Sequence, residues 1–183
     1  MTATIGIDPG PQLHVWVPGT PAPQGSMKAY VRGGRAHLVS DNKRTMPWRE
    51  AIQNVLLAAG HGRELIDGPV RIEMEFWMPR LKGHYGKKGL LKSAPEFPAT
   101  KPDIDKLVRA VLDALTGVAL WDDSRVVSLT ARKQWALAQH EEGVAIRICP
   151  LAPYKGAVPW SQAPRRGPDG TRITAAHRGE EQA

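Results

Sequence analysis

Five aspartates lie within a short stretch of an otherwise basic chain: Asp103, Asp105, Asp113, Asp122 and Asp123. Carboxylate oxygens are ligands that Mg²⁺ prefers in proteins, and the ion usually keeps several waters beside them. A cation held in this way can activate water and neutralise charge on a phosphate. The stretch is therefore a candidate divalent-metal site for the hydrolysis of phosphodiesters.

A helix is predicted to position the first part of this site. From about Asp105 to Leu115 the apolar residues recur at helical spacing. They form one stripe, which consists of Leu107, Val108, Val111, Leu112 and Leu115. On the polar side, Asp105, Arg109 and Asp113 form a row at i, i+4 and i+8. The helix is therefore expected to present an acidic and cationic row opposite its buried face.

The simplest fold of this segment returns the pair at 122–123 toward the start of the helix, and roles follow from that arrangement. We assign the metal to Asp103, Asp105 and Asp123, with Asp122 as a further candidate. Arg109, one turn after Asp105, would contact the scissile phosphate through its forked guanidinium. Asp113 is expected to align Arg109 through an i, i+4 pair, in preference to a place in the metal shell.

A purely structural explanation of the same aspartates competes with the metal site. Aspartate before a helix is a frequent cap, and acidic residues in a first turn interact favourably with the helix dipole. Asp122, Asp123 and Ser124 could form an ordinary turn. From the residues alone the structural explanation is favoured, although it makes the two acidic pairs around one helix a coincidence. The family resemblance described next shifts the preference to the metal site.

The acidic stretch also resembles a family signature. The matching residues are Lys101-Pro102-Asp103-Ile104-Asp105, Arg109, Asp113-Ala114-Leu115, Trp121-Asp122-Asp123 and Val126-Val127. They are similar to the signature of RusA-type Holliday-junction resolvases, which are small, dimeric, magnesium-dependent DNA endonucleases common in phages and prophages. The likeness is dense over residues 101–127 and looser from 13 to 148. It implies Mg²⁺ as the cofactor, with Mn²⁺ as a substitute, a homodimer, and branched DNA as the partner.

Two positions depart from the family pattern. The family commonly has Asn directly after the second aspartate, where this chain has Lys106, and Lys four residues after it, where this chain has Arg109. The arginine keeps the charge but changes its geometry, whereas Lys106 removes an amide acceptor. These departures leave a non-catalytic junction-binding protein of the same fold as the alternative function.

The charge distribution favours an anionic partner. The 183 residues carry a formal charge of +7, and the sequence pI is about 9.8. Residues 28–49 and 80–101 each hold six Lys or Arg against one acidic residue, so cations flank the acidic centre. Such cations suit DNA phosphates, although two solvated loops explain the composition equally well. The candidate DNA-binding residues are Lys28, Arg32, Arg35, Lys43, Arg44, Arg80, Lys82, Lys87, Lys88, Lys101 and Lys106.

Periodicity and turn residues predict the remaining elements. They indicate a helix over 48–59, a hairpin over 28–32 and 35–39, and strands over 13–17, 70–78, 126–131 and 144–148. A long polar loop covers 80–101. Glu73 and Glu75 share the polar face of one strand, where a solvated sheet surface is favoured over a metal role. The predicted fold class is α/β or α+β, with a small mixed β-sheet and two helices packed mainly on one face.

Three regions are expected along the chain. Residues 1–12 are predicted to be a flexible N-terminus, 13–149 a RusA-like nuclease domain, and 150–183 a largely disordered basic tail rich in Pro, Gly and Arg. The single cysteine, Cys149, excludes an intramolecular disulfide. No apolar run is long enough for a bilayer and no signal pattern opens the chain. A cytoplasmic protein is therefore expected, nucleoid-associated or, if phage-encoded, in the host cytoplasm, with no membrane partner.

Together these features predict a metal-dependent, structure-specific DNA endonuclease. As the resemblance implies, a homodimer would resolve four-way or related branched junctions by paired symmetric nicks, in recombination, repair or phage DNA processing. The non-catalytic alternative would bind junctions without nicking them. A magnesium-dependent nucleotide phosphohydrolase is less favoured, because no P-loop motif is present and the flanking cations suit a polymer.

Overall fold

The structure is a computed structural model that describes most of the chain. The described residues are 13–25, 27–32, 35–40, 42–60, 64–137, 141–151, 158–159, 165–166 and 172–173. The helices are α1 (Thr45–Ala58) and α2 (Ile104–Leu115), with 3₁₀ turns η1 (Lys82–His84) and η2 (Asp123–Arg125). The longer strands are β1 (Leu13–Pro18), β2 (Met27–Arg32), β3 (Arg35–Ser40), β5 (Val70–Met78), β8 (Val126–Trp135) and β9 (Gly143–Pro150). Two-residue strands are β4 (Glu64–Leu65), β6 (Tyr85–Gly86), β7 (Gly89–Leu90), β10 (Val158–Pro159), β11 (Arg165–Arg166) and β12 (Arg172–Ile173).

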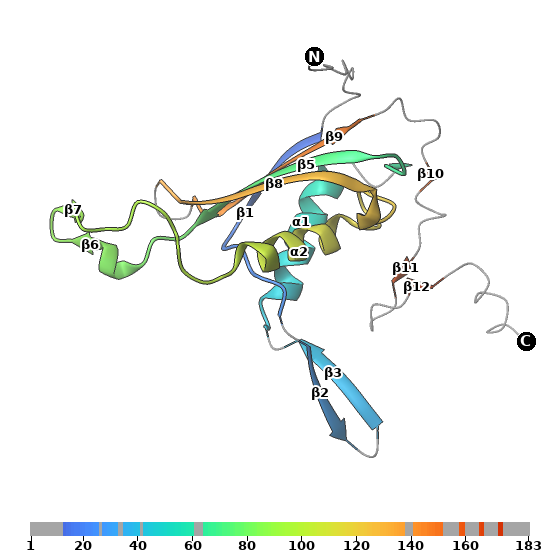
Figure 1. Ribbon diagram of the computed structural model, residues 1–183, viewed down its shortest axis with the longest axis horizontal. Coiled ribbons are helices and arrows are strands. Elements are labelled where there is room, and N and C mark those ends of the chain that lie inside the picture. Colours follow the sequence, from blue (N-terminus) through green and yellow to red (C-terminus); the bar gives the residue numbers. More distant parts are fainter. Residues whose placement is uncertain are drawn as a thin grey trace, which may run out of the picture.

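Four strands form the central sheet, in the order β1-β9-β5-β8 (Figure 1). β9 pairs antiparallel with both β1 and β5, whereas β5 and β8 are parallel. A parallel pair requires a crossover connection, and the segment that contains α2 supplies it. β8 is consequently an edge strand of this sheet, with α2 packed beside it.

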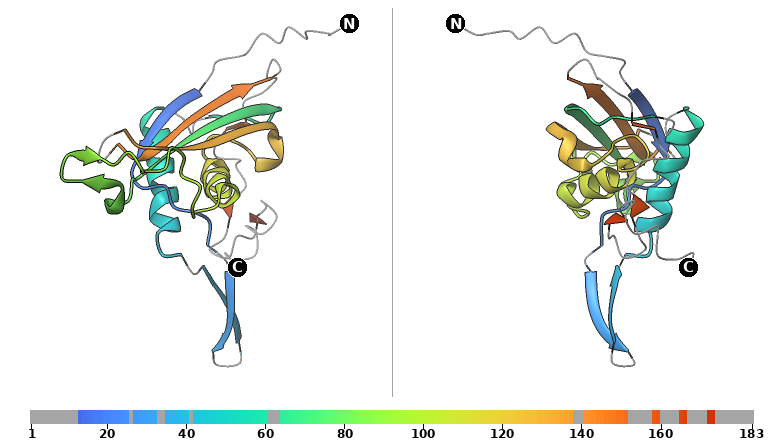
Figure 2. Two further views of the ribbon diagram at one scale, coloured as in Figure 1. Left: turned by 60° about the vertical axis from the view of Figure 1, so that its left-hand side comes forward. Right: turned by 90° about the vertical axis from the view of Figure 1, so that its right-hand side faces the viewer.

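The core lies between the sheet and the two helices, which cover the same face of the sheet (Figure 2). Side chains of β5 alternate, and Ile72, Met74 and Phe76 are almost completely buried against the helices. In α2 the predicted stripe is buried except at Leu112, which is half-buried. Complete burial of a leucine such as Leu107 contributes about 1.5–3 kcal/mol to folding. The core therefore holds α2 in a defined rotation, with its polar row outward.

The opposite face of the sheet carries paired charges. Glu73 forms ion pairs with Arg71 at 3.5 Å and Arg147 at 3.2 Å, and Glu75 pairs with Arg132. These glutamates lie on the face away from the helices, because they alternate with the buried residues of β5. The expected solvated sheet surface is confirmed, and neither glutamate contributes to the site beside α2.

The predicted α+β architecture is confirmed, and the differences have local causes. β8 continues to Trp135, four residues beyond the predicted end at Ala131. The sequence Arg132-Lys133-Gln134 has no apolar alternation, yet its backbone pairs with β5 in the same register. Backbone pairing with β5 therefore extends β8 beyond the point at which the side-chain pattern predicts its end.

Several predictions concern residues whose description is partial or absent. The hairpin is confirmed as β2 and β3, with Arg32 opposite Arg35, but the side chains of both strands lie outside the described residues. Residues 1–12 and most of 152–183 also lie outside them. The flexible N-terminus and the disordered tail therefore stay predictions. No helix among the described residues is long and apolar enough to cross a membrane.

Candidate functional site

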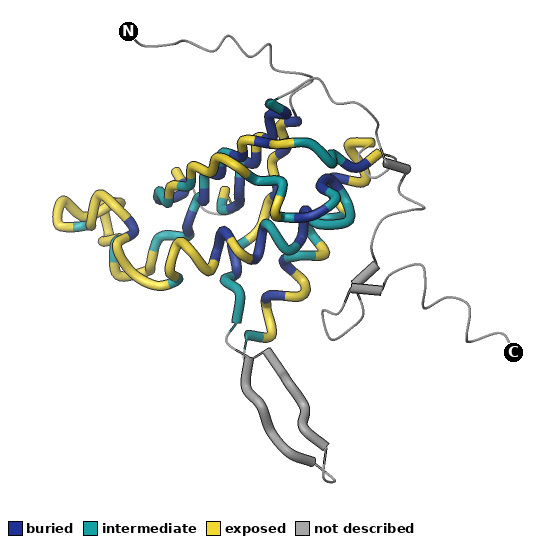
Figure 3. The backbone as a smooth tube through the Cα atoms, turned by 45° about the vertical axis from the view of Figure 1, so that its right-hand side comes forward, coloured by how far each residue is buried: buried dark blue, intermediate teal, exposed yellow. Residues whose placement is uncertain are grey.

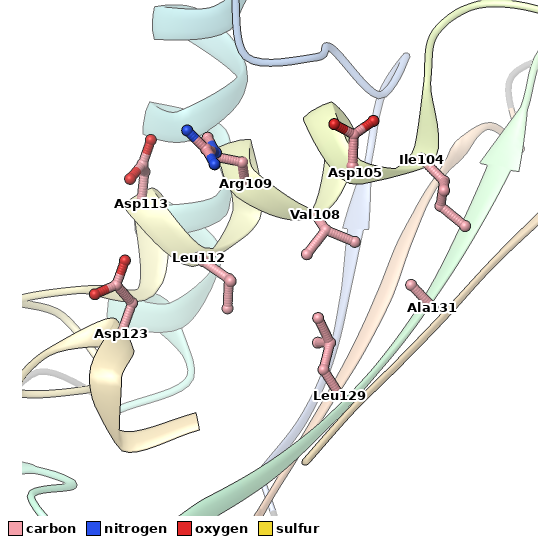
Figure 4. A pocket seen from close by; sticks show the side chains of 9 residues that line it. All are labelled: Ile104, Asp105, Val108, Arg109, Leu112, Asp113, Asp123, Leu129 and Ala131. Carbon is pink, nitrogen blue, oxygen red and sulfur yellow. The ribbon is translucent and has the colours of Figure 1, made fainter. Parts of the chain in front are cut away.

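A pocket of about 650 Å³ opens at the β8 edge of the sheet, between α2, η2 and β8 (Figure 4). It is lined by Ile104, Asp105, Val108, Arg109, Leu112, Asp113, Asp123, Leu129 and Ala131. In Figure 4 Val108 and Leu112 point from α2 toward Leu129 on β8, while Asp105 and Arg109 stand on the opposite side of α2. The pocket thus combines an apolar floor with three carboxylates and one guanidinium.

Three of the charged side chains at this pocket have no protein partner among the described residues. Asp105, Arg109 and Asp123 form no ion pair and no side-chain hydrogen bond with any residue that the structure describes. Charged groups in a protein usually satisfy part of their hydrogen-bonding capacity with neighbours or water. These three are therefore available to a ligand that enters the pocket.

Asp113, the third carboxylate at the pocket, is held by the other helix. Its Oδ2 forms an ion pair with Nη2 of Arg49 in α1, and Arg49 also donates a hydrogen bond to Oε1 of Gln24 at 2.6 Å. Both charged side chains are about four-fifths buried, at 22% and 19% exposure. The prediction that Asp113 aligns Arg109 is wrong in this structure: α1 packs beside α2 and brings a closer cation to that carboxylate.

Asp103 stands at the N-cap of α2 without capping it. Its side chain accepts no hydrogen bond from the helix amides, and its Oδ2 instead lies 3.3 Å from Nζ of Lys106. Both side chains are 47% exposed, so this is a solvent-screened pair of modest strength. The capping explanation therefore does not apply to Asp103. The cation paired with Asp103 is Lys106, one of the two residues that depart from the family pattern.

The adjacent aspartates of the second pair have different environments. Asp122 is 8% exposed, and its Oδ1 accepts a hydrogen bond from the backbone N–H of Ser124 at 3.1 Å. It therefore caps η2, as the structural explanation expects. Asp123, one residue later, turns into the pocket. Of this pair, only Asp123 is placed to meet a ligand there.

The predicted metal ligands are not gathered into one preformed cluster. Among the described residues, no three side chains of the metal-binding types come together as a cation site. Asp105 lies at the amino-terminal end of α2, whereas Asp123 approaches the other end of the pocket, near Asp113 (Figure 4). Eight residues of helix between Asp105 and Asp113 correspond to about 12 Å. The expected grouping of Asp103, Asp105 and Asp123 is therefore not present in this chain by itself.

Comparison with known proteins decides the family of this chain. The family model described as "Endodeoxyribonuclease RusA" matches residues 18–149. The chain belongs to the RusA endodeoxyribonuclease family. It is also 32% identical over 124 residues to a Bacillus subtilis (strain 168) protein, the "Uncharacterized protein YqaN", and the match covers 63% of this chain and 82% of that relative. The resemblance seen around Asp103 and Asp105 is confirmed.

In this RusA-family chain the candidate DNA-binding residues differ in exposure and in their partners. Exposed cations are Lys43 and Arg44 before α1, Lys82, Lys87 and Lys88 after β5, and Lys101 before α2. Arg80 is engaged, since its guanidinium lies 5.3 Å from the ring centre of Trp135. Lys106 pairs with Asp103. The side chains of Lys28, Arg32 and Arg35 lie outside the described residues.

The sequence analysis did not predict a lysine that binds the backbone just before α2. Lys133, on the inner side of β8, donates hydrogen bonds to the backbone carbonyls of Thr100 at 2.8 Å and Pro102 at 2.9 Å. Thr100 and Pro102 both lie within the three residues before Asp103. Alternation along β8 would have placed Lys133 on the same face as Leu129 and Ala131, but nothing in the sequence indicates its backbone partners. Lys133 thus ties the acidic motif to the sheet.

Proposed function

We propose that this RusA-family protein is a metal-dependent, structure-specific DNA endonuclease that resolves four-way or related branched junctions by paired nicks as a homodimer. The observation that carries the proposal is the set of unpaired charges at one pocket: Asp105, Arg109 and Asp123. Two carboxylates and a phosphate-binding guanidinium are what metal-assisted phosphodiester hydrolysis requires. Family membership supplies DNA as the substrate class.

The donor chemistry of the pocket fits a hard divalent cation. Asp105 and Asp123 offer unpaired carboxylate oxygens, and Mg²⁺ commonly binds through one or two carboxylates, several waters and substrate phosphates. A preformed cluster of three ligands is therefore unnecessary. Because Asp105 and Asp123 lie at opposite ends of the pocket, a Mg²⁺ or Mn²⁺ ion held by Asp123, or by Asp105 with Asp103 beside it, would complete its coordination with waters and a substrate phosphate. The ion would supply an activated water and charge neutralisation.

The remaining groups would bind and orient the substrate. Arg109 would contact the scissile phosphate, because its guanidinium is free of Asp113 and projects from the same helix as Asp105. Val108, Leu112 and Leu129 form the apolar floor of the pocket, whereas Asp105 and Arg109 are exposed on the other side of α2, where a large substrate can reach them. The exposed lysines on both sides favour a polymeric anion over a free nucleotide.

The proposal is tested with a labelled synthetic four-way junction and a linear duplex of the same sequence, each in Mg²⁺, Mn²⁺ or EDTA. We expect paired nicks in the junction with either metal, little cleavage of the duplex, and none in EDTA. Equal cleavage of both DNAs would contradict structure specificity. Release of inorganic phosphate from free nucleotides, without junction cleavage, would favour the phosphohydrolase instead.

One observation favours the alternative of a non-catalytic junction-binding protein. The ammonium group of Lys106 lies 3.3 Å from Oδ2 of Asp103, where it competes with a metal ion for that carboxylate. This alternative predicts tight, salt-sensitive junction binding and no nicking in either metal. The charge at Lys106 is therefore a direct means of distinguishing the two functions.

Replacing Lys106 with Asn should lower the metal concentration that gives half-maximal nicking. An exposed ion pair of this kind is worth about 0.2–1 kcal/mol, which corresponds to a shift of up to about fivefold. The measurement is a titration of Mg²⁺ against nicking rate. Lys101→Asn is the matched control, since Lys101 is exposed nearby and forms no ion pair with Asp103 among the described residues. An unchanged midpoint in Lys106→Asn would show that this ammonium does not compete with the metal.

A further inference from the structure

Residues 81–97 form an arm that projects from the sheet and helices (Figures 1 and 2). The arm contains η1 and the small β6–β7 hairpin, and almost all of it is exposed (Figure 3). Sequence analysis predicted a long polar loop here, but the arm contains a 3₁₀ turn and a short hairpin and is not uniformly polar. Its composition and anchoring indicate a binding role.

Large apolar side chains are concentrated on the arm. Among the described residues, five of the twelve large hydrophobic side chains that are exposed lie within these seventeen positions. They are Leu81, Tyr85, Leu90, Leu91 and Phe97. Single exposed apolar residues are normal, but a local group of them marks an interaction site. Phe97 at 65% and Leu90 at 52% exposure have no cover within the described chain.

The tip of the arm pairs an aromatic and an aliphatic residue behind two lysines. In the hairpin, Tyr85 lies opposite Leu90 and Gly86 opposite Gly89, so Lys87 and Lys88 form the turn. Gly89 has a φ of +107°, which favours glycine. At Gly86 a Cβ would lie 2.9 Å from Cδ2 of Leu91, so the tip is closely packed. The tip thus presents a compact apolar surface with positive charge at its end.

The base of the arm is fastened to the end of β8. Nε1 of Trp135 donates a hydrogen bond to the Pro95 carbonyl at 2.9 Å, and His84 packs edge-on against the Trp135 ring at 5.0 Å between ring centres. Arg80 covers the same ring. These contacts hold the two legs of the arm together, so its exposed groups are preorganised for a partner.

The arm also leads directly into the pocket. Its return leg continues through Thr100 and Pro102, whose carbonyls are bound by Lys133, to Asp103 at the start of α2. The tip of the arm projects away from the sheet and helices on the side where α2 begins (Figure 1). An extended partner such as branched DNA could therefore contact both the tip and the Asp105 end of the pocket.

The charge of the arm selects among possible partners. Lys82, Lys87, Lys88 and Lys92 stand against Glu96 alone, which favours a polyanion. In a continuous duplex the base faces are stacked on one another, so an aromatic or aliphatic side chain can reach them only by unstacking a base step, which costs a few kcal/mol. At a branch point, base faces are exposed, and aromatic or aliphatic groups can stack on them or enter between them.

We propose that the arm recognises the branch point of junction DNA: Tyr85 and Leu90 contact exposed base faces, and Lys87 and Lys88 contact the flanking phosphates. This inference rests on the proposed function to the extent that branched DNA is the ligand. It assigns the selection of junction over duplex DNA, at the binding step, to residues that lie outside the pocket. It predicts that junction preference and phosphate attraction are separable within one arm.

The test uses a four-way junction with 2-aminopurine at the branch point, bound in EDTA so that no cleavage occurs. Wild type is expected to raise the 2-aminopurine fluorescence, since unstacking increases its emission. The double variant Tyr85→Ser with Leu90→Ser should lose most of this rise. Its affinity for the junction over the duplex should fall about tenfold, as one lost stacking contact costs about 1–3 kcal/mol.

Three further variants test the separate contributions of the arm. Lys87→Ala with Lys88→Ala should weaken junction and duplex binding alike. The slope of log affinity against log salt concentration should fall by the equivalent of up to about two phosphate contacts. At saturating protein the rise in 2-aminopurine fluorescence should be the same as in wild type. Leu57→Ser, an equally exposed leucine on α1, should change neither quantity. Tyr85→Phe, which keeps the aromatic ring, should retain the signal even if the double serine variant proves unstable in thermal melting.

An unchanged fluorescence rise and junction preference in the folded double variant would overturn the inference, and would point to a protein partner for the arm. The outcome is distinct from that of the nicking assay. A wild-type protein that never nicks but shows an arm-dependent branch-point signal contradicts the proposed endonuclease and supports the inference. If the Tyr85→Ser, Leu90→Ser variant nicks junctions at the wild-type rate and keeps the wild-type junction preference, the endonuclease proposal is supported and the inference about the arm is contradicted.

Discussion

Replacing Asp105 with Asn is expected to lower the rate of metal-dependent junction nicking by at least about 10³-fold, with junction affinity within about threefold of wild type. The carboxylate is exposed, lines the pocket and has no partner among the described residues, so the amide of equal size disturbs no protein contact. Loss of a ligand to the metal removes several kcal/mol of charge stabilisation, and each 1.36 kcal/mol is tenfold in rate. The measurement is single-turnover nicking in Mg²⁺ beside binding in EDTA.

The matched control for Asp105 is Glu50→Gln, which makes the same change of charge on the exposed side of α1. Its nicking rate should stay within about twofold of wild type. Because Asp105 forms no stabilising pair among the described residues, its variant should also melt at the wild-type temperature within error. Undiminished nicking by Asp105→Asn would show that the pocket beside α2 is not the catalytic centre.

The scaffold of the site was predictable because it depends on local patterns. Alternation along β5 and the apolar stripe of α2 each report a buried face, and the structure buries Phe76 and Leu107 as those patterns require. The row of Asp105, Arg109 and Asp113 follows from helical geometry once α2 is placed. The family signature added the substrate class, which periodicity does not contain.

The partners of the charged groups were not predictable, because they depend on tertiary contacts. Asp113 could reach Arg109 on its own helix, but Arg49 arrives from α1, 64 residues earlier in the chain. The choice between them is decided by how α1 packs on α2 and by the partial burial of the pair. The same packing leaves Arg109 free for a ligand, so the failed prediction strengthens the role assigned to Arg109.

The sequence also could not predict the different environments of two adjacent aspartates. Asp122 and Asp123 are equivalent in the sequence, yet Asp122 is buried and caps η2, while Asp123 lines the pocket. A change of one position around a 3₁₀ turn rotates the side chain by about a third of a turn. Sequence spacing therefore identified the acidic pair but left open which member faces a ligand.

Replacing Arg109 with Ala should lower the maximal nicking rate by about 10²–10³-fold, the loss typical of removing one preorganised donor that stabilises developing charge. Junction binding should weaken far less, because Arg109 supplies one phosphate contact among many. Arg109→Lys, which restores the residue common in the family, should remain within about tenfold of wild type, since the cation is kept and only the forked geometry is lost. Single-turnover rates at saturating protein separate these effects from changes in affinity.

Arg132→Ala is the matched control, since Arg132 lies on the far face of the sheet and pairs with Glu75. It should nick at close to the wild-type rate, because it lies outside the pocket lining. If Arg109→Ala weakens binding and leaves the rate at saturation intact, Arg109 belongs to the DNA-binding surface and another group stabilises the scissile phosphate. If instead the rate at saturation falls and Arg109→Lys restores it, the cation itself, free of Asp113 and next to Asp105, is what the reaction requires.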